Sequence, residues 1–201
     1  MVKGKIVEVS LERFLQHGIR SMTIKKLVEP LGISTKTVYK YFDSKEALLE
    51  ECLLILYSGS FNEFNAILSG KDNPVITLLM VFRGALSRDF GVNHTFYHDL
   101  NYYYPELQNA AIDKIRKNYG NLMLPLIENG VKEGYFCQDI IPEIALKGIS
   151  TLYTSITRSE EYKEYKGSPY ELLKNLVEVF IRGMCTEKGL KEIENNPYHN
   201  D

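Results

Sequence analysis

The chain has 201 residues, of which 44% are apolar and 25% charged, and its formal net charge at pH 7 is −2. That is enough apolar sequence for one large or two small domains with a real core. No apolar run approaches the ~20 residues of a membrane span and no signal peptide is visible, so we exclude a membrane partner and expect a cytoplasmic protein.

The charge is unevenly distributed. Residues 1–50 hold nine Lys or Arg and six Asp or Glu, a local charge of +3, which leaves −5 for the remainder. Positive charge favours contact with phosphates, and an acidic body discourages nonspecific coating of DNA. Because many exposed helices are this basic, the excess alone is weak support.

A short capped helix is predicted after Thr23. Thr23 precedes apolar residues spaced three and four apart, which lie on one helical face, and Gly32 supplies the stop. The apolar residues are Ile24, Leu27, Val28 and Leu31.

A second helix follows within two residues. Ser34 can cap it, and Val38 and Phe42, one turn apart, can face inward. At about eight residues and ~1.5 Å per residue it would be roughly 12 Å long, which suits a DNA major groove. Ser44 then caps a longer helix that opens at Lys45.

The outer face of this second helix carries residues suited to DNA. Thr35, Lys36 and Thr37 can touch base edges. Phosphate contacts are expected from four others, and backbone amides near Lys45 add a site for a phosphate oxygen. These four are Tyr39, Lys40, Tyr41 and Lys45, and the capping residues Thr23 and Ser34 complete the predicted DNA-binding set. The alternative is a three-helix packing unit with a solvated basic face.

Residues 6–49 resemble the N-terminal domain of the tetracycline-repressor (TetR) family of transcription factors. Residues 6–18 resemble the family's first helix with its closing glycine, residues 32–42 its recognition helix, and residues 43–49 the start of its fourth helix. The resemblance implies a helix-turn-helix DNA-binding domain over 1–47 and a helical ligand-binding and dimerisation domain over 48–190. A polar C-terminal tail over 191–201 is expected to fray from Glu187 onward.

Pro30 departs from the family's pattern, which usually places a good helix former there. Proline cannot donate to the carbonyl of Lys26 and its ring crowds that carbonyl. We predict that the helix after Thr23 is kinked or shortened.

The rest of the chain predicts further helices and no strands, so the fold class is all-α. A long fourth helix ends at residues 70–74, and others cover 75–89, about 95–102, and 105–133, the last kinked by Gly120 and Pro125. Pro142 starts one late helix, and residues 168–171 form a capping box with proline that starts another.

These two late helices are more apolar than one buried stripe requires. We therefore predict that they pair with their copies in a second subunit, since two-fold dimers place recognition helices about 34 Å apart on two half-sites. The alternative is an internal bundle position in a monomer. The predicted dimer interface is Ile149, Leu152, Ile156, Leu172, Leu176, Val179, Phe180 and Gly183.

The middle of the chain is rich in aromatic residues. The family resemblance implies a pocket here for a small-molecule effector, and tyrosines can line a mostly apolar cavity while offering hydroxyls. Plain core packing is the alternative for each of them. The predicted pocket residues are Phe82, Tyr97, Tyr103, Tyr119, Met123 and Tyr153.

No cofactor or metal site is predicted. His94 and His98 are spaced like a metal pair but lack a visible third ligand. Cys52, Cys137 and Cys185 are odd in number and widely spaced, so buried free thiols are expected.

The leading functional hypothesis is a homodimeric transcriptional regulator, a repressor that releases a pseudo-palindromic operator when a small molecule occupies its C-terminal domain. One rival is a helical ligand-binding or protein-interaction dimer without an operator. A second rival is an enzyme that uses the aromatic pocket. No nucleophile elbow, phosphate loop, zinc motif or triad spacing supports the enzyme.

Overall fold

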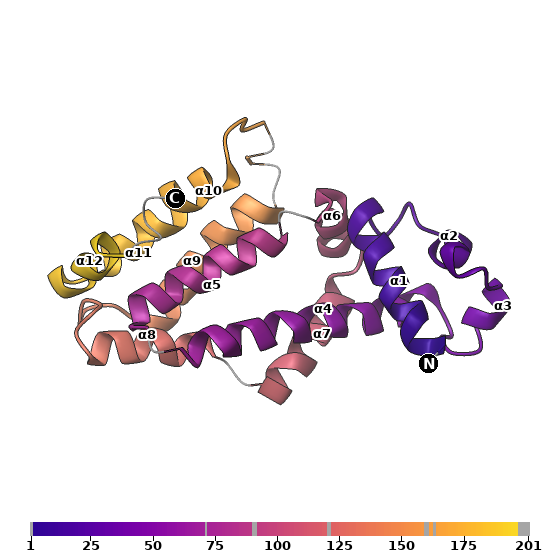
Figure 1. Cartoon of the computed structure of the whole chain (residues 1–201), viewed down its shortest axis with the longest axis horizontal. Helices are drawn as coiled ribbons and strands as arrows, with labels where there is room; N and C mark the ends of the chain where they lie inside the picture. The colour runs from indigo at the N-terminus through magenta and orange to yellow at the C-terminus, as the bar shows by residue number, and fades with distance from the viewer. Residues whose placement is uncertain are drawn as a thin grey trace. The chain divides into compact units, whose positions relative to one another are not determined.

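The computed structural model describes residues 2–70, 72–89, 92–119, 122–158, 161–162 and 164–196, without the side chains of His94, Arg158 and residues 116–119. These residues form helices and connecting loops (Figure 1), with one isolated antiparallel bridge between Phe136 and Cys185. The all-α prediction is confirmed. No helix in the described part of the chain is long and apolar enough to cross a membrane.

The chain divides into two compact units, each with its own core. The first comprises Met1–Asn62 and Gly91–Gly120, and the second comprises Glu63–Phe90 and Asn121–Asp201. Helix α4, Lys45–Leu68, contributes residues to both.

The first unit contains the predicted DNA-binding helices. Phe14 and Leu27 lie in its core, and Phe96 and Leu100, about 80 residues further along, lie there too. The helices are α1 Val2–His17, α2 Ile24–Val28, α3 Thr35–Val38, the first part of α4, α6 His94–Tyr103 and α7 Pro105–Tyr119.

The shortening at Pro30 that was predicted for the helix after Thr23 is confirmed. Helix α2 ends at Val28, and Pro30 lies in the following 3-10 turn η1, Glu29–Leu31. A proline there does not break an α-helical ladder, because the α-helix has already ended. Gly32 follows with a positive φ of 63°, the left-handed conformation that closes the turn.

The helix predicted after Ser34 is shorter than expected. Helix α3 covers only Thr35–Val38, and the chain continues as a turn through Tyr41. The amides of both Tyr41 and Phe42 donate to the carbonyl of Val38, so the last turn tightens into 3-10 geometry. Val38 and Phe42 are both buried, as predicted.

The second unit is a bundle built around α5, Pro74–Asp89, which is buried along much of its length. The other helices are α8 Met123–Lys132, α9 Pro142–Arg158, α10 Pro169–Leu172, the π-helix η2 Leu173–Glu178, α11 Val179–Met184 and α12 Glu187–Glu194. The predicted capping box is present, since the amide of Ser168 donates to Glu171 at 3.0 Å and the Ser168 hydroxyl caps α10.

Two expectations for this part of the chain were wrong in part. The stretch from residue 105 to 133 is interrupted as predicted after Tyr119, where α7 ends just before Gly120. Pro125 does not interrupt it, because this proline lies in the first turn of α8, where a missing donor costs nothing. Residues 187–194 are not frayed, because α12 is capped by Thr186 and buries Ile193, and the expectation for residues 197–201 lies outside the described residues. Burial of Ile193 thus stabilises α12 although most of its residues are polar.

A close approach within the second unit depends on a glycine. A Cβ added to Gly130 in α8 would lie 2.3 Å from the Phe136 ring, which is fully buried. Only a residue without a side chain therefore lets this ring pack against the α8 backbone.

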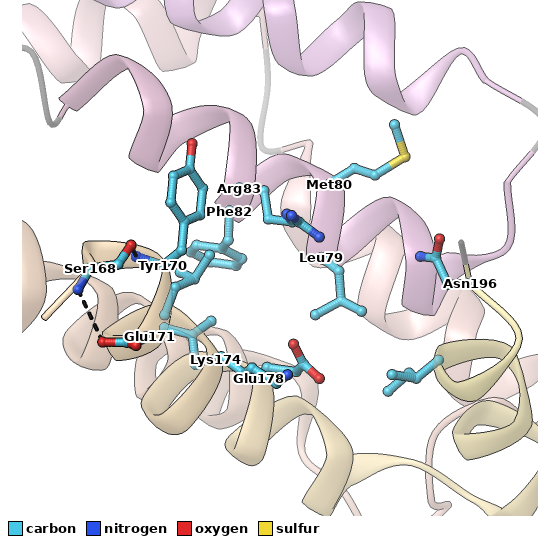
Figure 2. A pocket seen from close by; sticks show the side chains of 13 residues that line it. Leu79, Met80, Phe82, Arg83, Ser168, Tyr170, Glu171, Lys174, Glu178 and Asn196 are labelled. Atoms are coloured by element: carbon cyan, nitrogen blue, oxygen red, sulfur yellow. Dashed lines mark hydrogen bonds between the residues drawn. The ribbon is translucent and has the colours of Figure 1, made fainter. Parts of the chain in front are cut away.

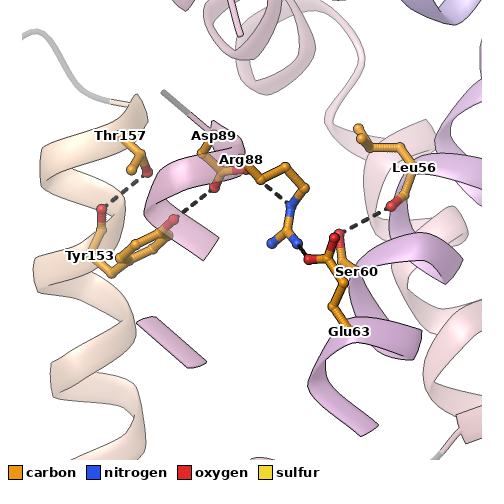
Figure 3. A network of polar contacts seen from close by, with 7 residues as sticks. All are labelled: Leu56, Ser60, Glu63, Arg88, Asp89, Tyr153 and Thr157. Carbon is orange, nitrogen blue, oxygen red and sulfur yellow. Dashed lines mark hydrogen bonds and ion pairs between the residues drawn. The ribbon is translucent and has the colours of Figure 1, made fainter. Parts of the chain in front are cut away.

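A polar network connects three helices of the second unit (Figure 3). The Tyr153 hydroxyl of α9 donates to Asp89 at 3.0 Å, and Arg88 pairs with Glu63 near the end of α4. The Arg88 Nε lies 3.7 Å from the other Asp89 oxygen.

Candidate nucleic-acid interface

Side-chain caps fix the starts of α2 and α3. The Thr23 hydroxyl accepts from the amide of Lys26 at 3.3 Å, and the Ser34 hydroxyl accepts from the amide of Thr37 at 3.2 Å. The hydroxyls of Ser34 and Thr37 are also 3.1 Å apart, within hydrogen-bonding distance. Both capping predictions are confirmed, and both hydroxyls therefore have a structural role before any ligand is present.

The outward face of α3 and its turn is basic and aromatic. Tyr39 is 53% exposed and Tyr41 44% exposed. Lys36 and Lys40 are exposed as well. Thr35 and Thr37 are half-buried. Large tyrosines left in solvent beside lysines, above a buried Val38, form a surface that could meet a sugar-phosphate backbone.

Lys45 differs from the other predicted phosphate contacts. Its ammonium donates to the carbonyl of Ile19 at 2.6 Å and lies 5.9 Å from the centre of the Phe14 ring. Burial lowers the pKa of this lysine. The side chain thus joins the start of α4 to the loop after α1, and reaching a phosphate would compete with that contact.

Asp99 positions the loop between α1 and α2, a role that sequence analysis missed. Its buried carboxylate accepts from the amides of Ile19 and Arg20, both at 2.8 Å. Gly18 precedes them with a φ of 78°. An acidic residue among the apolar positions of α6 was the available signal, because a buried carboxylate requires donors.

Arg20 is fixed by Tyr103. Its guanidinium donates to the Tyr103 hydroxyl at 2.7 Å and lies 4.1 Å from the centre of that ring. Together with Asp99, this contact ties α6 to the end of α1 within the first unit.

Residues 6–52 match the family described as bacterial regulatory proteins, tetR family. This stretch contains the capped turn, the exposed face of α3 and the start of α4. Residues 6–52 therefore form a TetR-family DNA-binding domain. The chain is a DNA-binding transcriptional regulator and not an enzyme.

Two of the similar curated proteins are named repressors. The chain is 23% identical over 162 residues to the HTH-type transcriptional repressor KstR2 of Mycobacterium tuberculosis, covering 77% of this chain and 79% of KstR2. KstR2 of Rhodococcus jostii is 22% identical over 148 residues, covering 72% of each chain.

Solved structures share the fold. Reduced NemR of E. coli superposes with a TM-score of 0.75 at 18% identity, covering 92% of this chain and 98% of NemR. The fatty acid degradation regulator FadR from Bacillus halodurans gives 0.71 at 20% identity, covering 90% of this chain and 98% of FadR. At such identities the likeness extends to the fold alone.

The predicted effector-pocket residues fall in both units of the regulator. Tyr97 is buried in the first core, and Tyr103 makes the contact with Arg20. Phe82 and Tyr153 pack in the second core with their ring centres 5.3 Å apart, and Met123 lies at the edge of that core. The side chain of Tyr119 lies outside the described residues.

The second unit also holds a cavity of about 650 Å³ (Figure 2). Its lining comes from α5, from the helix that runs from Ser168 through η2, and from the region of α12. Of the predicted pocket residues, Phe82 lines it. The polar residues around it include Arg83, Tyr170 and Lys174.

The predicted dimer residues lie at different depths. Ile149 and Ile156 are buried in the second core, and Leu152, Leu172 and Leu176 are half-buried. The exposed ones are on α11, where Val179 is 57% and Phe180 36% exposed. Gly183 is exposed as well, with open space where a Cβ would stand.

Of the two histidines spaced like a metal pair, only His98 has a described side chain, and it lies in no cluster of described metal-ligand residues. His98 stacks on Tyr102, with ring centres 6.0 Å apart, and the side chain of His94 lies outside the description. No three His, Cys, Asp or Glu residues in the described ranges could hold a metal ion together. All three cysteines are free, with Cys52 and Cys185 buried and Cys137 half-buried, and burial raises the pKa of the Cys52 thiol to about 12.

Proposed function

We propose that this regulator is a homodimeric repressor that leaves a pseudo-palindromic operator when a small molecule occupies its C-terminal domain. DNA binding is assigned to residues 1–47, effector binding and dimerisation to residues 48–190 together with the rest of α12. The observation that carries the proposal is the exposed basic and aromatic surface of α3, a helix that Ser34 caps and that buries Val38 beneath this surface.

Repression is supported by the relatives. The KstR2 proteins that align with more than two thirds of this chain are named transcriptional repressors. A repressor needs only to occupy its operator, so an exposed reading surface and a dimer interface suffice for the activity.

Dimerisation is supported by an apolar surface on α9 and α11. Ile144 is 66% exposed, and Val179 and Phe180 add exposed apolar area beyond it. Phe180 approaches α9 closely, since a Cβ on Gly148 would lie 2.9 Å from its ring. Large apolar side chains left in solvent mark association surfaces. A two-fold copy would also double the few bases that one short helix can contact.

Effector release follows from linkage. A small molecule can lower operator affinity only if it binds the DNA-free form more tightly, and DNA then weakens effector binding by the same factor, typically ~5 to 150-fold.

The deciding experiment selects bound duplexes from a random pool and then titrates salt against the selected duplex. We expect a site with two related half-sites and affinity that falls steeply with added salt, because several phosphates are neutralised. A selection that yields no preferred sequence, from a protein that is dimeric in sedimentation, would favour the dimer without an operator.

A further inference from the structure

The cavity in the second unit has an apolar interior. Leu79 and Phe82 line it from α5, Leu173 and Val177 line it from η2, and Ile193 lines it from α12. Leu173, Val177 and Ile193 are buried side chains of the second core. Its volume of about 650 Å³ lies within the ~300–1,000 Å³ typical of small-molecule sites.

Two cations and two carboxylates line the cavity: Arg83, Lys174, Glu171 and Glu178. Glu171 accepts from the amide of Ser168 at 3.0 Å and from the Tyr165 hydroxyl at 2.8 Å, and Glu178 lies 3.5 Å from Arg182. Lys174 also lines the cavity and is exposed, and no hydrogen bond or ion pair joins its ammonium to a described residue. An acidic group on a ligand would therefore find a cation available at this edge.

The wall that carries Lys174 has unusual geometry. Leu173–Glu178 is a π-helix between the α-helical segments α10 and α11, and four of its six residues line the cavity. π-helical turns are rare and are frequent at functional sites. Each one takes an extra residue per turn, so relaxation to α geometry would turn the following residues by about 100° around the axis.

The residues that follow are those of the exposed face. Val179 begins α11 directly after η2, and Phe180 comes next. A change in the register of η2 would move both relative to Gly148 of α9, against which Phe180 packs.

We propose that this cavity binds a small amphipathic anion, an apolar body with one acidic group directed at Lys174, and that its occupancy shifts the register of η2 and so turns the Val179–Phe180 face. The ligand site stands on the cavity alone, whereas its regulatory consequence rests on the dimer proposed above. The ligand acts on the equilibrium only through its different affinity for the two registers.

The test uses the full chain and two matched probes, 4-cyclohexylbutanoate and 4-cyclohexylbutanol, titrated by calorimetry without DNA. We expect one carboxylate bound per chain and weaker binding of the alcohol. Lys174→Gln should weaken the carboxylate about three- to fivefold, as for a partly exposed charge pair, and leave the alcohol within twofold. Lys132→Gln, an exposed lysine on α8 outside the cavity, is the control.

Filling the cavity should abolish binding of both probes. Val177→Phe adds volume from η2, and Leu79→Phe adds it from α5, so the test survives if one variant does not fold. Unchanged carboxylate binding in a folded filling variant, or an equal response of both probes to Lys174→Gln, would overturn the assigned site.

The register change can be followed by tryptophan fluorescence. Because the chain contains no tryptophan, an introduced one is the only indole that emits. Phe180→Trp places a single indole on the face that should turn. We expect its emission to shift when the carboxylate saturates the cavity, and to stay constant when Val177→Phe is added. Constant emission at saturation would refute the register shift. A protein that binds the carboxylate but no operator would refute only the proposed function.

Discussion

At the scale of single residues, the exposed face of α3 separates two kinds of contact. Tyr39 and Tyr41 present hydroxyls on large, half-exposed rings, which suits phosphates. Lys36 extends from the first turn of α3, which suits a base edge.

Tyr39→Phe should therefore weaken binding to many duplexes alike, since a phosphate contact carries no sequence information. Lys36→Ala should change which duplex is preferred, by about 1–3 kcal/mol at one position. Gel-shift titrations on a set of single-base variants measure both. If neither variant changes any affinity, the reading face has been assigned wrongly.

Asp99 is a second residue whose chemistry follows from its position. Its carboxylate accepts two backbone amides in a buried site. Both amides donate to the same oxygen, Oδ2, and an asparagine would offer them a neutral carbonyl oxygen instead, so two charge-assisted hydrogen bonds become weaker neutral ones. Asp99→Asn should lower the free energy of unfolding by about 1–3 kcal/mol. Urea denaturation measures this loss, with Asp139→Asn on an exposed loop as the control. Equal midpoints for the two variants would show that the loop after α1 is held by other contacts.

At the scale of elements, caps and glycines decide where the helices begin and how closely they pack. Thr23, Ser34, Ser44 and Ser168 cap helices at the predicted positions. These ends were predictable because a capping hydroxyl and its amide are only two or three residues apart. The length of α3 and the π geometry of η2 were not, since neither has a local signature in this chain.

Two helical glycines provide a matched test of packing. Gly130→Ala should destabilise the protein by about 1–3 kcal/mol, because the added methyl overlaps the buried Phe136 ring. Gly59→Ala, in the middle of α4 with nothing within 4 Å, should instead stabilise it by about 0.5–1 kcal/mol. Thermal unfolding of both variants tests the opposite signs. Stabilisation by Gly130→Ala would mean that the Phe136 ring has room to move.

At the scale of the whole molecule, two separate cores share helix α4. The unit that contains the DNA-binding helices also takes in residues 91–120, which fill its core with Phe96, Leu100 and Ala111. Regions far apart in sequence thus support the surface proposed to contact DNA.

Phe180→Glu should break the proposed dimer, because it places a charge on its exposed apolar face. Sedimentation should give a monomer, and operator affinity should fall at least tenfold, since one half-site alone is then read. The control is Lys132→Glu, which introduces the same glutamate at an exposed position on α8. A variant that remains dimeric would exclude α11 from the interface.

The amino-acid sequence by itself determined the all-α class, the caps, the early end of α2 at Pro30, and the resemblance of residues 6–49 to the TetR family. Each depends on neighbours within about one or two helical turns, whose spacing is readable from the chain. Only the tertiary structure decided that Asp99 holds the loop after α1, that Lys45 turns toward Ile19, and that a cavity opens beside a π-helix. Those features depend on contacts between segments distant in sequence, and a helical period specifies which face is buried but not which partner buries it.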